Sequence, residues 1–435
     1  MTTRRDVLAG MAAGGVAGVA PAAASATRRR GAMPAHFLWG AAISAHQSEG
    51  NDVNSDSWLL EHLPETLYKE PSGDACDSYN LYARDFAIAR AIGLNCYRFG
   101  IGWSRIEPEP GSFSQAELDH YRRVLVSCRA HGLLPILSFN HFTVPRWFAM
   151  RGGWEVRDSA DLFARCCDRA TRAFGDLIGM ASPFNEANIN LLVKVFYGAN
   201  GARNPKRDAM IAAAARATNS PHFSTLGFAD AERVTPQLLD AHAKAYQAMK
   251  AGPGDFPVGV SLTTQAIEPV GEGSIADRVE ATLYGDWWDA VNASDFVGVQ
   301  PYTRVRVDAK GVMAPPGGAE LTAAGYEFYP QALGEVVRLA ARKTRKPIYV
   351  TESGIGTDDD ARRVAWLDAS VAEVRRCLAD GIDVRSYIYW SLLDNFEWTQ
   401  GYADRFGLVS VDRASFARTL KPSARHFAGI IRRST

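Results

Sequence analysis

Short apolar runs recur eight times along this chain, and longer segments with helical spacing lie between them. The runs occupy 37–44, 95–101, 134–141, 179–186, 257–264, 295–302, 347–353 and 384–392. The clearest helical segments are 77–92, 115–131, 159–177, 235–250 and 361–380. Eight alternations of strand and helix are typical of a closed parallel barrel rather than an open sheet. We therefore predict an α/β fold, a single (β/α)8 TIM barrel with long βα loops.

Glycines punctuate this alternation, and four of them stand shortly before a predicted strand. Gly93, Gly132, Gly179 and Gly381 are therefore predicted to cap the preceding helices. Proline and glycine accumulate in 188–232, after the fourth strand, and in 303–328, after the sixth. We expect long loops there that border a pocket at the carboxyl ends of the strands.

Composition narrows the class of protein. The 435 residues are 47% hydrophobic and 22% charged, which suits one barrel domain over 27–435. Its 48 basic and 48 acidic side chains cancel, so neither nucleic acid nor an anionic membrane is an expected partner. The six cysteines lack metal-ligand spacing, and we expect buried thiols.

The first 26 residues carry a different pattern. Arg4 and Arg5 precede a Gly/Ala-rich apolar stretch that ends near Ala20, and Ala24, Ser25 and Ala26 follow. This resembles a twin-arginine export signal over 1–26, with cleavage after Ala26. A tail or a short anchor is the alternative, but the stretch is too short and glycine-rich for stable membrane insertion. We expect a periplasmic or extracellular protein that folds before export, with its cysteines reduced.

Two glutamates close predicted strands, Glu186 in the fourth run and Glu352 in the seventh. A single glutamate at a strand end is more often a solvated or ion-paired residue. In a barrel, however, all carboxyl ends face one pocket, and paired carboxyl groups there indicate glycosidic bond cleavage. The other strand ends also supply side chains able to bind a polyol: Gln47, Arg98, His141, Asn185, Tyr302 and Trp390.

Several longer motifs resemble glycoside hydrolase family 1, the β-glucosidase-like barrels. They cover nearly the whole chain after the export signal, from about 37 to 422. The motifs are FLWGAAISAHQSEG at 37–50, YRFGIGWSRIEP at 97–108, FNEAN at 184–188, YVTESG at 349–354, YWSLLDNFEW at 389–398 and GYADRFGLVSVD at 401–412. The resemblance implies a retaining, exo-acting β-glycosidase that forms a covalent glycosyl-enzyme intermediate.

By this resemblance, Glu352 is the nucleophile and Glu186 is the general acid and base. Arg98 and Tyr302 match positions that hydrogen-bond the nucleophile, and a cation there favours its ionised form. Glu186 has no obvious cationic neighbour in its motif, so burial is expected to keep it protonated near neutral pH.

The resemblance also implies the ligands of the sugar. Gln47, His141, Asn185, Glu397 and Trp398 correspond to hydroxyl ligands, and Trp390 to a stacking platform. A carboxylate at Glu397 suits an unphosphorylated sugar and disfavours a sugar 6-phosphate. The expected partner is thus a small-molecule glycoside, with no metal and no cofactor.

Three positions depart from the family pattern. Ala187 replaces a proline, Ser353 replaces an asparagine, and Gln300-Pro301-Tyr302 stands where Asn-Tyr-Tyr is usual. The loss of proline is expected to loosen the turn after Glu186. The alternative function is a catalytically silent glycan-binding barrel, although both glutamates are kept. The sequence leaves the preferred sugar, the aglycone and the oligomeric state open.

Overall fold

Eight parallel strands form the centre of the molecule in a computed structural model, which describes residues 31–201 and 204–434. The predicted export signal at 1–26 lies outside the described residues and stays a prediction. The strands are β1 (Leu38–Ala42), β2 (Cys96–Gly100), β3 (Leu134–Asn140), β4 (Met180–Phe184), β5 (Val260–Pro269), β6 (Val297–Val307), β7 (Ile348–Ser353) and β8 (Val384–Trp390). All eight lie within or overlap the predicted runs, so the predicted fold class is confirmed.

The strands pair in the order β4-β3-β2-β1-β8-β7-β6-β5. The remaining seam, between β4 and the residues just before β5, is bridged by backbone hydrogen bonds. The Ala181 N–H donates to the Pro257 carbonyl (2.9 Å), and the Gly259 N–H donates to the Ala181 carbonyl (3.0 Å). Neighbours in sequence are therefore neighbours around the ring, as short βαβ connections require.

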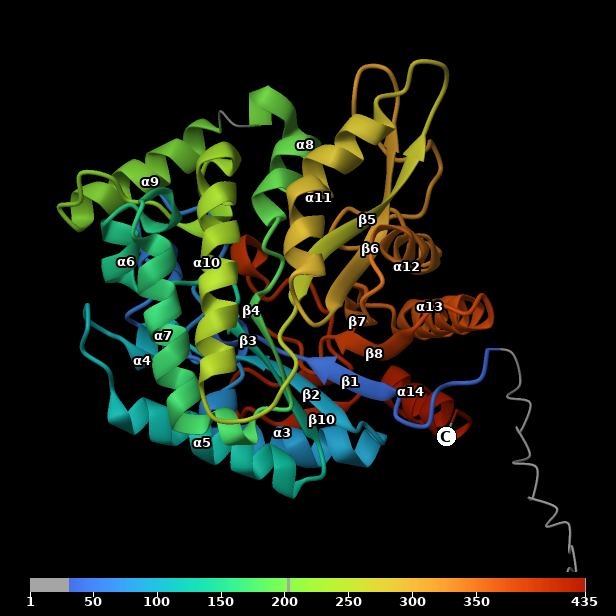
Figure 1. The fold of residues 1–435 in the computed structure, drawn as a ribbon, viewed down its shortest axis with the longest axis horizontal. Coiled ribbons are helices and arrows are strands. Elements are labelled where there is room, and N and C mark those ends of the chain that lie inside the picture. The colour runs from blue at the N-terminus through green and yellow to red at the C-terminus, as the bar shows by residue number, and fades with distance from the viewer. Residues whose placement is uncertain (1–30, 202–203, 435) are drawn as a thin grey trace, which may run out of the picture.

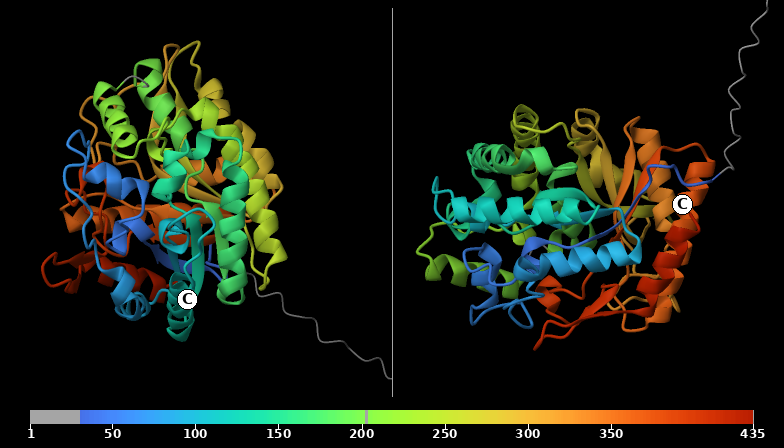
Figure 2. Two further views of the ribbon diagram at one scale, coloured as in Figure 1. Left: turned by 90° about the vertical axis from the view of Figure 1, so that its left-hand side faces the viewer. Right: turned by 90° about the horizontal axis from the view of Figure 1, so that it is seen from below.

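Helices surround this sheet, as the two further views show (Figure 2). The α-helices are α1 (Ala45–Ser48), α2 (Asp56–Glu61), α3 (Ser78–Ile92), α4 (Trp103–Ile106), α5 (Gln115–Ala130), α6 (Arg146–Met150), α7 (Ser159–Phe174), α8 (Ile189–Gly201), α9 (Pro205–Ala217), α10 (Ala231–Ala251), α11 (Ala276–Asn292), α12 (Ala332–Lys343), α13 (Asp360–Ala379) and α14 (Pro422–Arg432). Because helices cover the outside and side chains fill the inside, β2, β4 and β7 are buried along their whole length.

The core has two parts. A small cluster fills the inside of the barrel with side chains from different strands and from the loops that follow them: Ala42, Cys96, Ile136, Met180, Phe296, Tyr349, Ile388, Trp390 and Phe406. A larger cluster lies mainly between the strands and the surrounding helices. The barrel is therefore packed at its centre, as in other barrels of this kind.

Three predicted boundaries were wrong: the start of α10 and the ends of β5 and β6. Helix α10 begins at Ala231, before the predicted start at 235, because Asp230 accepts hydrogen bonds from the N–H groups of Glu232 and Arg233 as an N-cap. Pro236 lies inside this helix. Strands β5 and β6 continue beyond the barrel as a paired ribbon, from Ala266 opposite Arg304 to Pro269 opposite Val307.

The glycine prediction holds at three positions and fails at one. Gly93, Gly132 and Gly381 follow helices with positive φ angles of 99°, 70° and 84°. Gly179 is not a helix cap, because α7 ends at Phe174 and a short 3-10 helix follows it. A Cβ atom at Gly179 would collide with the Leu134 side chain, so close packing against β3 explains this glycine.

The predicted insertions form elements of their own. The segment after β4 contains α8, α9 and a 3-10 helix at Leu226–Phe228, and the segment after β6 forms a loop closed by the bridge between Leu321 and Glu327. All six cysteines are free and buried, as predicted. Among the described helices, none is long and apolar enough to cross a membrane.

Candidate active site

A cavity of about 430 Å³ opens where the strands end. Glu186 follows β4, Glu352 lies in β7, and both buried carboxyl groups line this cavity. All the predicted site residues line it except Arg98, which lies buried in β2 and contacts two of them. The fold therefore brings together side chains that are remote in sequence, as the barrel prediction required.

Both carboxylate oxygens of Glu352 are held in place. Arg98 Nη1 donates to Oε1 at 2.6 Å, and the Tyr302 hydroxyl donates to Oε2 at 2.7 Å. Burial raises the pKa of Glu352, whereas the charge of Arg98 and the Tyr302 hydrogen bond oppose this rise because they favour the ionised form. Glu352 is thus an oriented carboxyl group with a cation in direct contact.

Glu186 has different surroundings. Burial, followed by the negative charge of Glu352, raises the pKa of Glu186 to about 8. A hydrogen bond from Thr263 and the more distant charge of Arg98 oppose this rise without cancelling it. With a pKa of about 8, Glu186 keeps its proton at neutral pH, and the two carboxyl groups titrate as an interacting pair.

The turn at Glu186 is held firmly although the family's proline is missing. Glu186 has a φ of 44°, an uncommon left-handed conformation for a residue with a side chain. The N–H of Ala187 donates to the Ser261 carbonyl in β5 at 3.3 Å, a bond that proline could not make. The Ser353 hydroxyl, at another departure, accepts a hydrogen bond from the Trp366 indole at 3.1 Å. Both departures thus have partners in this fold.

Asn185 connects Arg98 to His141, a residue that lines the cavity. Its amide oxygen accepts from Arg98 Nη2 (2.5 Å) and from Gln300 Nε2 (2.8 Å), and its nitrogen lies 3.1 Å from His141 Nε2. Burial and the charge of Arg98 lower the pKa of His141 well below its usual value. Neutral His141 therefore accepts at Nε2 and carries its proton on Nδ1, which is buried without a partner among the described residues.

Gln47 and Glu397 form a second polar pair. The Ser44 hydroxyl donates to Gln47 Oε1 (2.8 Å), and Gln47 Nε2 donates to the Phe396 carbonyl (2.9 Å) and to Glu397 Oε2 (3.2 Å). Desolvation raises the pKa of Glu397 well above its usual value. Its Oε1 is buried and has no hydrogen-bond partner within the described chain. Two residues that line the cavity, His141 and Glu397, thus each have one buried polar atom without a partner among the described residues.

Four rings stack beside these groups. His141 lies on Trp390 with ring centroids 5.4 Å apart and on Trp398 at 6.3 Å, and His46 stacks on Trp398 at 5.8 Å with an interplanar angle of 8°. Phe142 meets the edge of Trp398 at 5.3 Å. The two tryptophans are therefore fixed by neighbouring rings, which prepares a flat apolar surface for a sugar ring.

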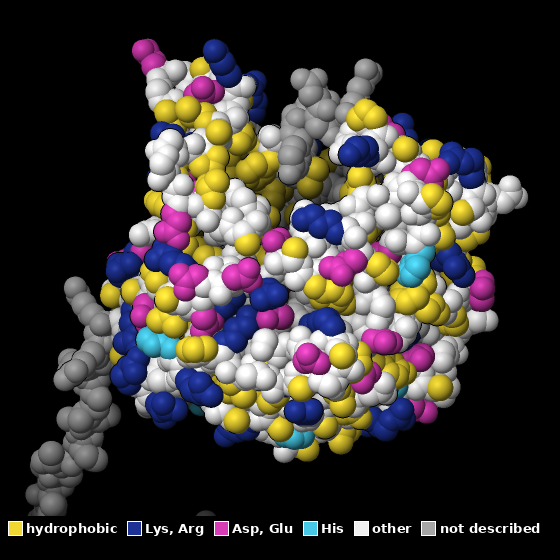
Figure 3. All heavy atoms as spheres, turned by 180° about the vertical axis from the view of Figure 1, so that it is seen from behind, with side chains coloured by type: hydrophobic (Ala, Val, Ile, Leu, Met, Phe, Trp, Pro, Cys, Tyr) yellow, Lys and Arg dark blue, Asp and Glu magenta, His cyan; other side chains and the backbone are white. Residues whose placement is uncertain are grey.

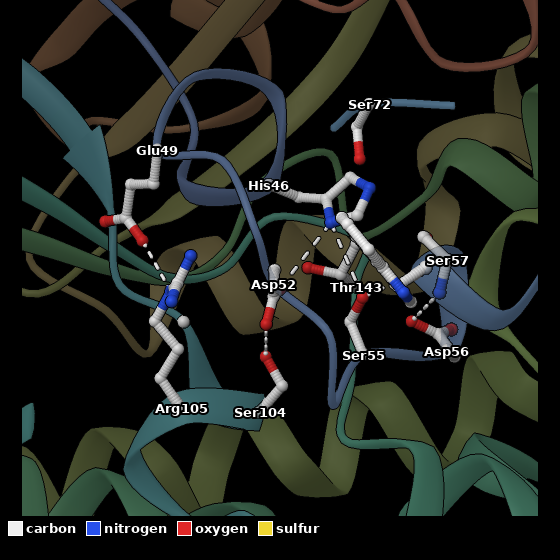
Figure 4. Close-up of polar contacts among 12 residues, drawn as sticks. His46, Glu49, Asp52, Ser55, Asp56, Ser57, Ser72, Ser104, Arg105 and Thr143 are labelled. Atoms are coloured by element: carbon white, nitrogen blue, oxygen red, sulfur yellow. Dashed lines mark hydrogen bonds and ion pairs between the residues drawn. The ribbon is translucent and has the colours of Figure 1, made fainter. Parts of the chain in front are cut away.

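His46 is held by acidic residues. Its Nε2 lies 2.7 Å from Glu61 and its Nδ1 lies 3.5 Å from Asp52. Figure 4 shows Asp52 and Ser55 pointing toward one ring nitrogen. Burial alone would lower the pKa of His46, but the hydrogen bonds and charges of Asp52 and Glu61 raise it to about 10. A buried imidazolium therefore supports Trp398.

Sequence reasoning missed four residues of this site: His46, Thr263, Gln265 and Gln300. Gln265 lies at a register shift between β5 and β6; its N–H donates to the Tyr284 hydroxyl (2.9 Å), and its side-chain amide donates to Thr263 (3.3 Å). The position of Gln300 at a strand end was a usable signal. His46 offered no sequence signal beyond its place beside Gln47. Among the described residues, no cluster of His, Cys, Asp or Glu has the arrangement of a metal site.

Comparison with known proteins identifies the class. The family model of glycosyl hydrolase family 1 matches residues 29–316 and 308–435. This chain belongs to that family, and it is a β-glycosidase.

Individual relatives align with this chain over most of their length. A 1,4-β-D-glucan glucohydrolase of Thermotoga neapolitana is 27% identical, and the alignment covers 92% of this chain and 98% of the relative. The human cytosolic β-glucosidase is also 27% identical with the same coverage. The apo structure of β-glucosidase 1317 is 44% identical, with a TM-score of 0.88, covering 91% of this chain and 98% of that one. A silent glycan-binding barrel is not favoured by these relatives.

Proposed function

We propose that this protein is a retaining, exo-acting β-glucosidase that removes terminal, unphosphorylated sugars through a covalent glycosyl-enzyme intermediate. The observation that carries the proposal is the contrast between two carboxyl groups in one cavity. Glu352 is oriented by Arg98 and Tyr302, whereas Glu186 has a pKa of about 8. This is the division of labour that retaining glycosidases require.

The first step uses both carboxyl groups. Ionised Glu352 attacks the anomeric carbon and forms an ester bond, while the bond to the leaving oxygen breaks and Glu186 gives that oxygen its proton. Glu186 then takes a proton from water, whose oxygen attacks the same carbon and releases Glu352. Two inversions give net retention. Retaining enzymes hold the two groups about 5 Å apart. Both carboxyl groups line the same cavity, as this mechanism requires.

The sugar-binding roles follow from the free polar atoms. The Nδ1–H of His141 is suited to donate to a hydroxyl, and Oε1 of Glu397 is suited to accept from one. The amide oxygen of Asn185 is already occupied, so its remaining N–H is the group available to the sugar 2-hydroxyl. Trp390 and Trp398 supply the apolar surface beside the ring.

Two further features support the choice of sugar. Among the described residues that line the cavity there is no lysine or arginine, so a sugar phosphate would meet no cation there. The preference for glucose and the exo mode are supported by relatives named β-glucosidase and 1,4-β-D-glucan glucohydrolase.

The test is to replace Glu352 with glycine. Turnover of nitrophenyl β-D-glucoside should fall by at least about 10³-fold, because the covalent route is lost. Added azide should restore part of it and yield the α-glucosyl azide. NMR of the wild-type reaction should show the β anomer as the first product. Undiminished activity of E352G, or an α anomer as first product, would overturn the retaining mechanism.

A further inference from the structure

The active-site cavity has a polar floor, which includes Gln47, Asn185 and Glu352, and a mouth of different composition. Helix α8 lines the mouth with Ile189, Leu192, Val193 and Phe196. Their spacing of three, one and three residues places them on one face of the helix. Val193 and Phe196 are 39% and 38% exposed, so this apolar face borders the cavity and solvent rather than the protein core.

Apolar side chains from two other segments complete the mouth. Phe228 belongs to the 3-10 helix at Leu226–Phe228, and Tyr326, 43% exposed, lies in the loop after β6. The Asn190 amide donates to the carbonyls of Leu226 (2.6 Å) and Ala229 (3.1 Å), which ties α8 to the segment carrying Phe228. Figure 3 shows a hollow at the upper edge of the molecule with hydrophobic side chains gathered in it.

Three polar side chains that line the cavity, those of Thr225, Thr303 and Gln265, donate hydrogen bonds within the protein. The Thr225 hydroxyl donates to Asp56, and the Thr303 hydroxyl donates to the Glu327 carbonyl at 3.0 Å. The amide nitrogen of Gln265 donates to Thr263, which leaves its Oε1 as an acceptor without a partner in the described chain. A second sugar placed against α8 would lose water from several hydroxyls and find few replacements, which is costly.

We propose that this mouth is a subsite for an extended apolar aglycone, a long alkyl or aryl group, rather than for a second sugar. The inference rests on the proposed function, since the aglycone is the leaving group that Glu186 protonates. The apolar face of α8 contributes through the surface it removes from water, and each methylene that reaches it strengthens binding.

The first experiment compares kcat/KM along a series of n-alkyl β-D-glucosides. Butyl, hexyl and octyl glucosides share one type of leaving oxygen, so differences among them report contacts with the mouth. We expect kcat/KM to rise by about two- to fourfold for each methylene that contacts α8. The kcat/KM for octyl glucoside should be well above that for cellobiose. All substrates are kept below the concentrations at which micelles form.

Two variants locate the effect. In V193S/F196S the gain from butyl to octyl glucoside should shrink by about tenfold or more, while methyl glucoside is hydrolysed as in the wild type. Val126 is a matched control, because it is also an exposed valine on a helix (50%, against 39% for Val193) and does not line the cavity. V126S should leave the whole series unchanged.

The outcomes separate the two proposals. If nitrophenyl β-D-glucoside is hydrolysed but chain length has no effect, or cellobiose exceeds octyl glucoside, the apolar subsite is wrong and the proposed function stands. An undiminished gain in V193S/F196S would also overturn the subsite. If no β-glucoside is hydrolysed, the proposed function fails first and the subsite fails with it.

Discussion

The floor and the mouth of one cavity follow opposite principles. At the floor, polar side chains such as Asn185, Gln47 and Glu352 are each held by two or more hydrogen bonds. At the mouth, Val193 and Phe196 offer apolar surface with no fixed geometry. Directional hydrogen bonds discriminate strongly between hydroxyl patterns, whereas apolar area discriminates weakly between shapes. We therefore expect this enzyme to be strict about the sugar and tolerant about the leaving group.

The largest expected effect comes from removing the acid where floor and mouth meet. E186A should lower kcat/KM for alkyl β-glucosides by about 10²- to 10⁴-fold, because a poor leaving group needs the proton. For a dinitrophenyl glucoside, whose leaving group needs no proton, the rate of the first step should fall far less. Steady-state rates for both substrates check this. E272A, at an exposed loop residue, serves as the control, and equal losses for both substrates would show that Glu186 is not the acid.

A second prediction concerns the support of the floor. H46Q removes the imidazolium between Asp52 and Glu61 and leaves two buried carboxylates without it, so the unfolding free energy should fall by about 3–5 kcal/mol. H426Q breaks an exposed pair with Asp368 and should cost at most about 1 kcal/mol. Thermal or denaturant unfolding measures both. The KM for the sugar should rise in H46Q, whereas the gain in kcat/KM from butyl to octyl glucoside should persist. Loss of that gain would mean that the floor and the mouth do not act separately.

The same histidine predicts a pH dependence of stability. The folded-state pKa of His46, about 10, lies above its ordinary value of 6.5. Its stabilising contribution is therefore complete below about pH 6.5 and is lost as the pH rises through about 10. The difference in unfolding free energy between wild type and H46Q should shrink over that interval. A difference that stays constant up to pH 10 would contradict the assignment of a charged His46.

The smallest effect tests the tuning of the acid. Loss of the proton from Glu186 should produce the alkaline limb of kcat/KM near pH 8, since the protonated form is the active one. Thr263 favours the ionised form, so T263V should raise the pKa of Glu186 and move this limb upward by about one pH unit. T282V, which removes a hydroxyl bonded only to its own helix, should not move it. A shift to lower pH in T263V would show that this hydrogen bond does not act on the charged form.

The barrel, and the two carboxyl groups that we propose react, could be predicted from local patterns in the sequence. Helix and strand patterns are local, so α3 and α5 were predicted to within a residue or two, and each strand was found within or overlapping its apolar run. Glu186 and Glu352 could be recognised because they close such strands and stand in long family motifs.

The surroundings of these two groups could not be predicted and became visible only in the folded structure. The pKa values of the two carboxyl groups depend on burial and on contacts with Arg98, Tyr302 and Thr263, which no local pattern encodes. The ion-paired His46 beneath Trp398, the extension of β5 and β6, and the exposure of one face of α8 likewise arise from packing between remote segments. Burial and charge act through space, and a chain specifies them only once it has folded.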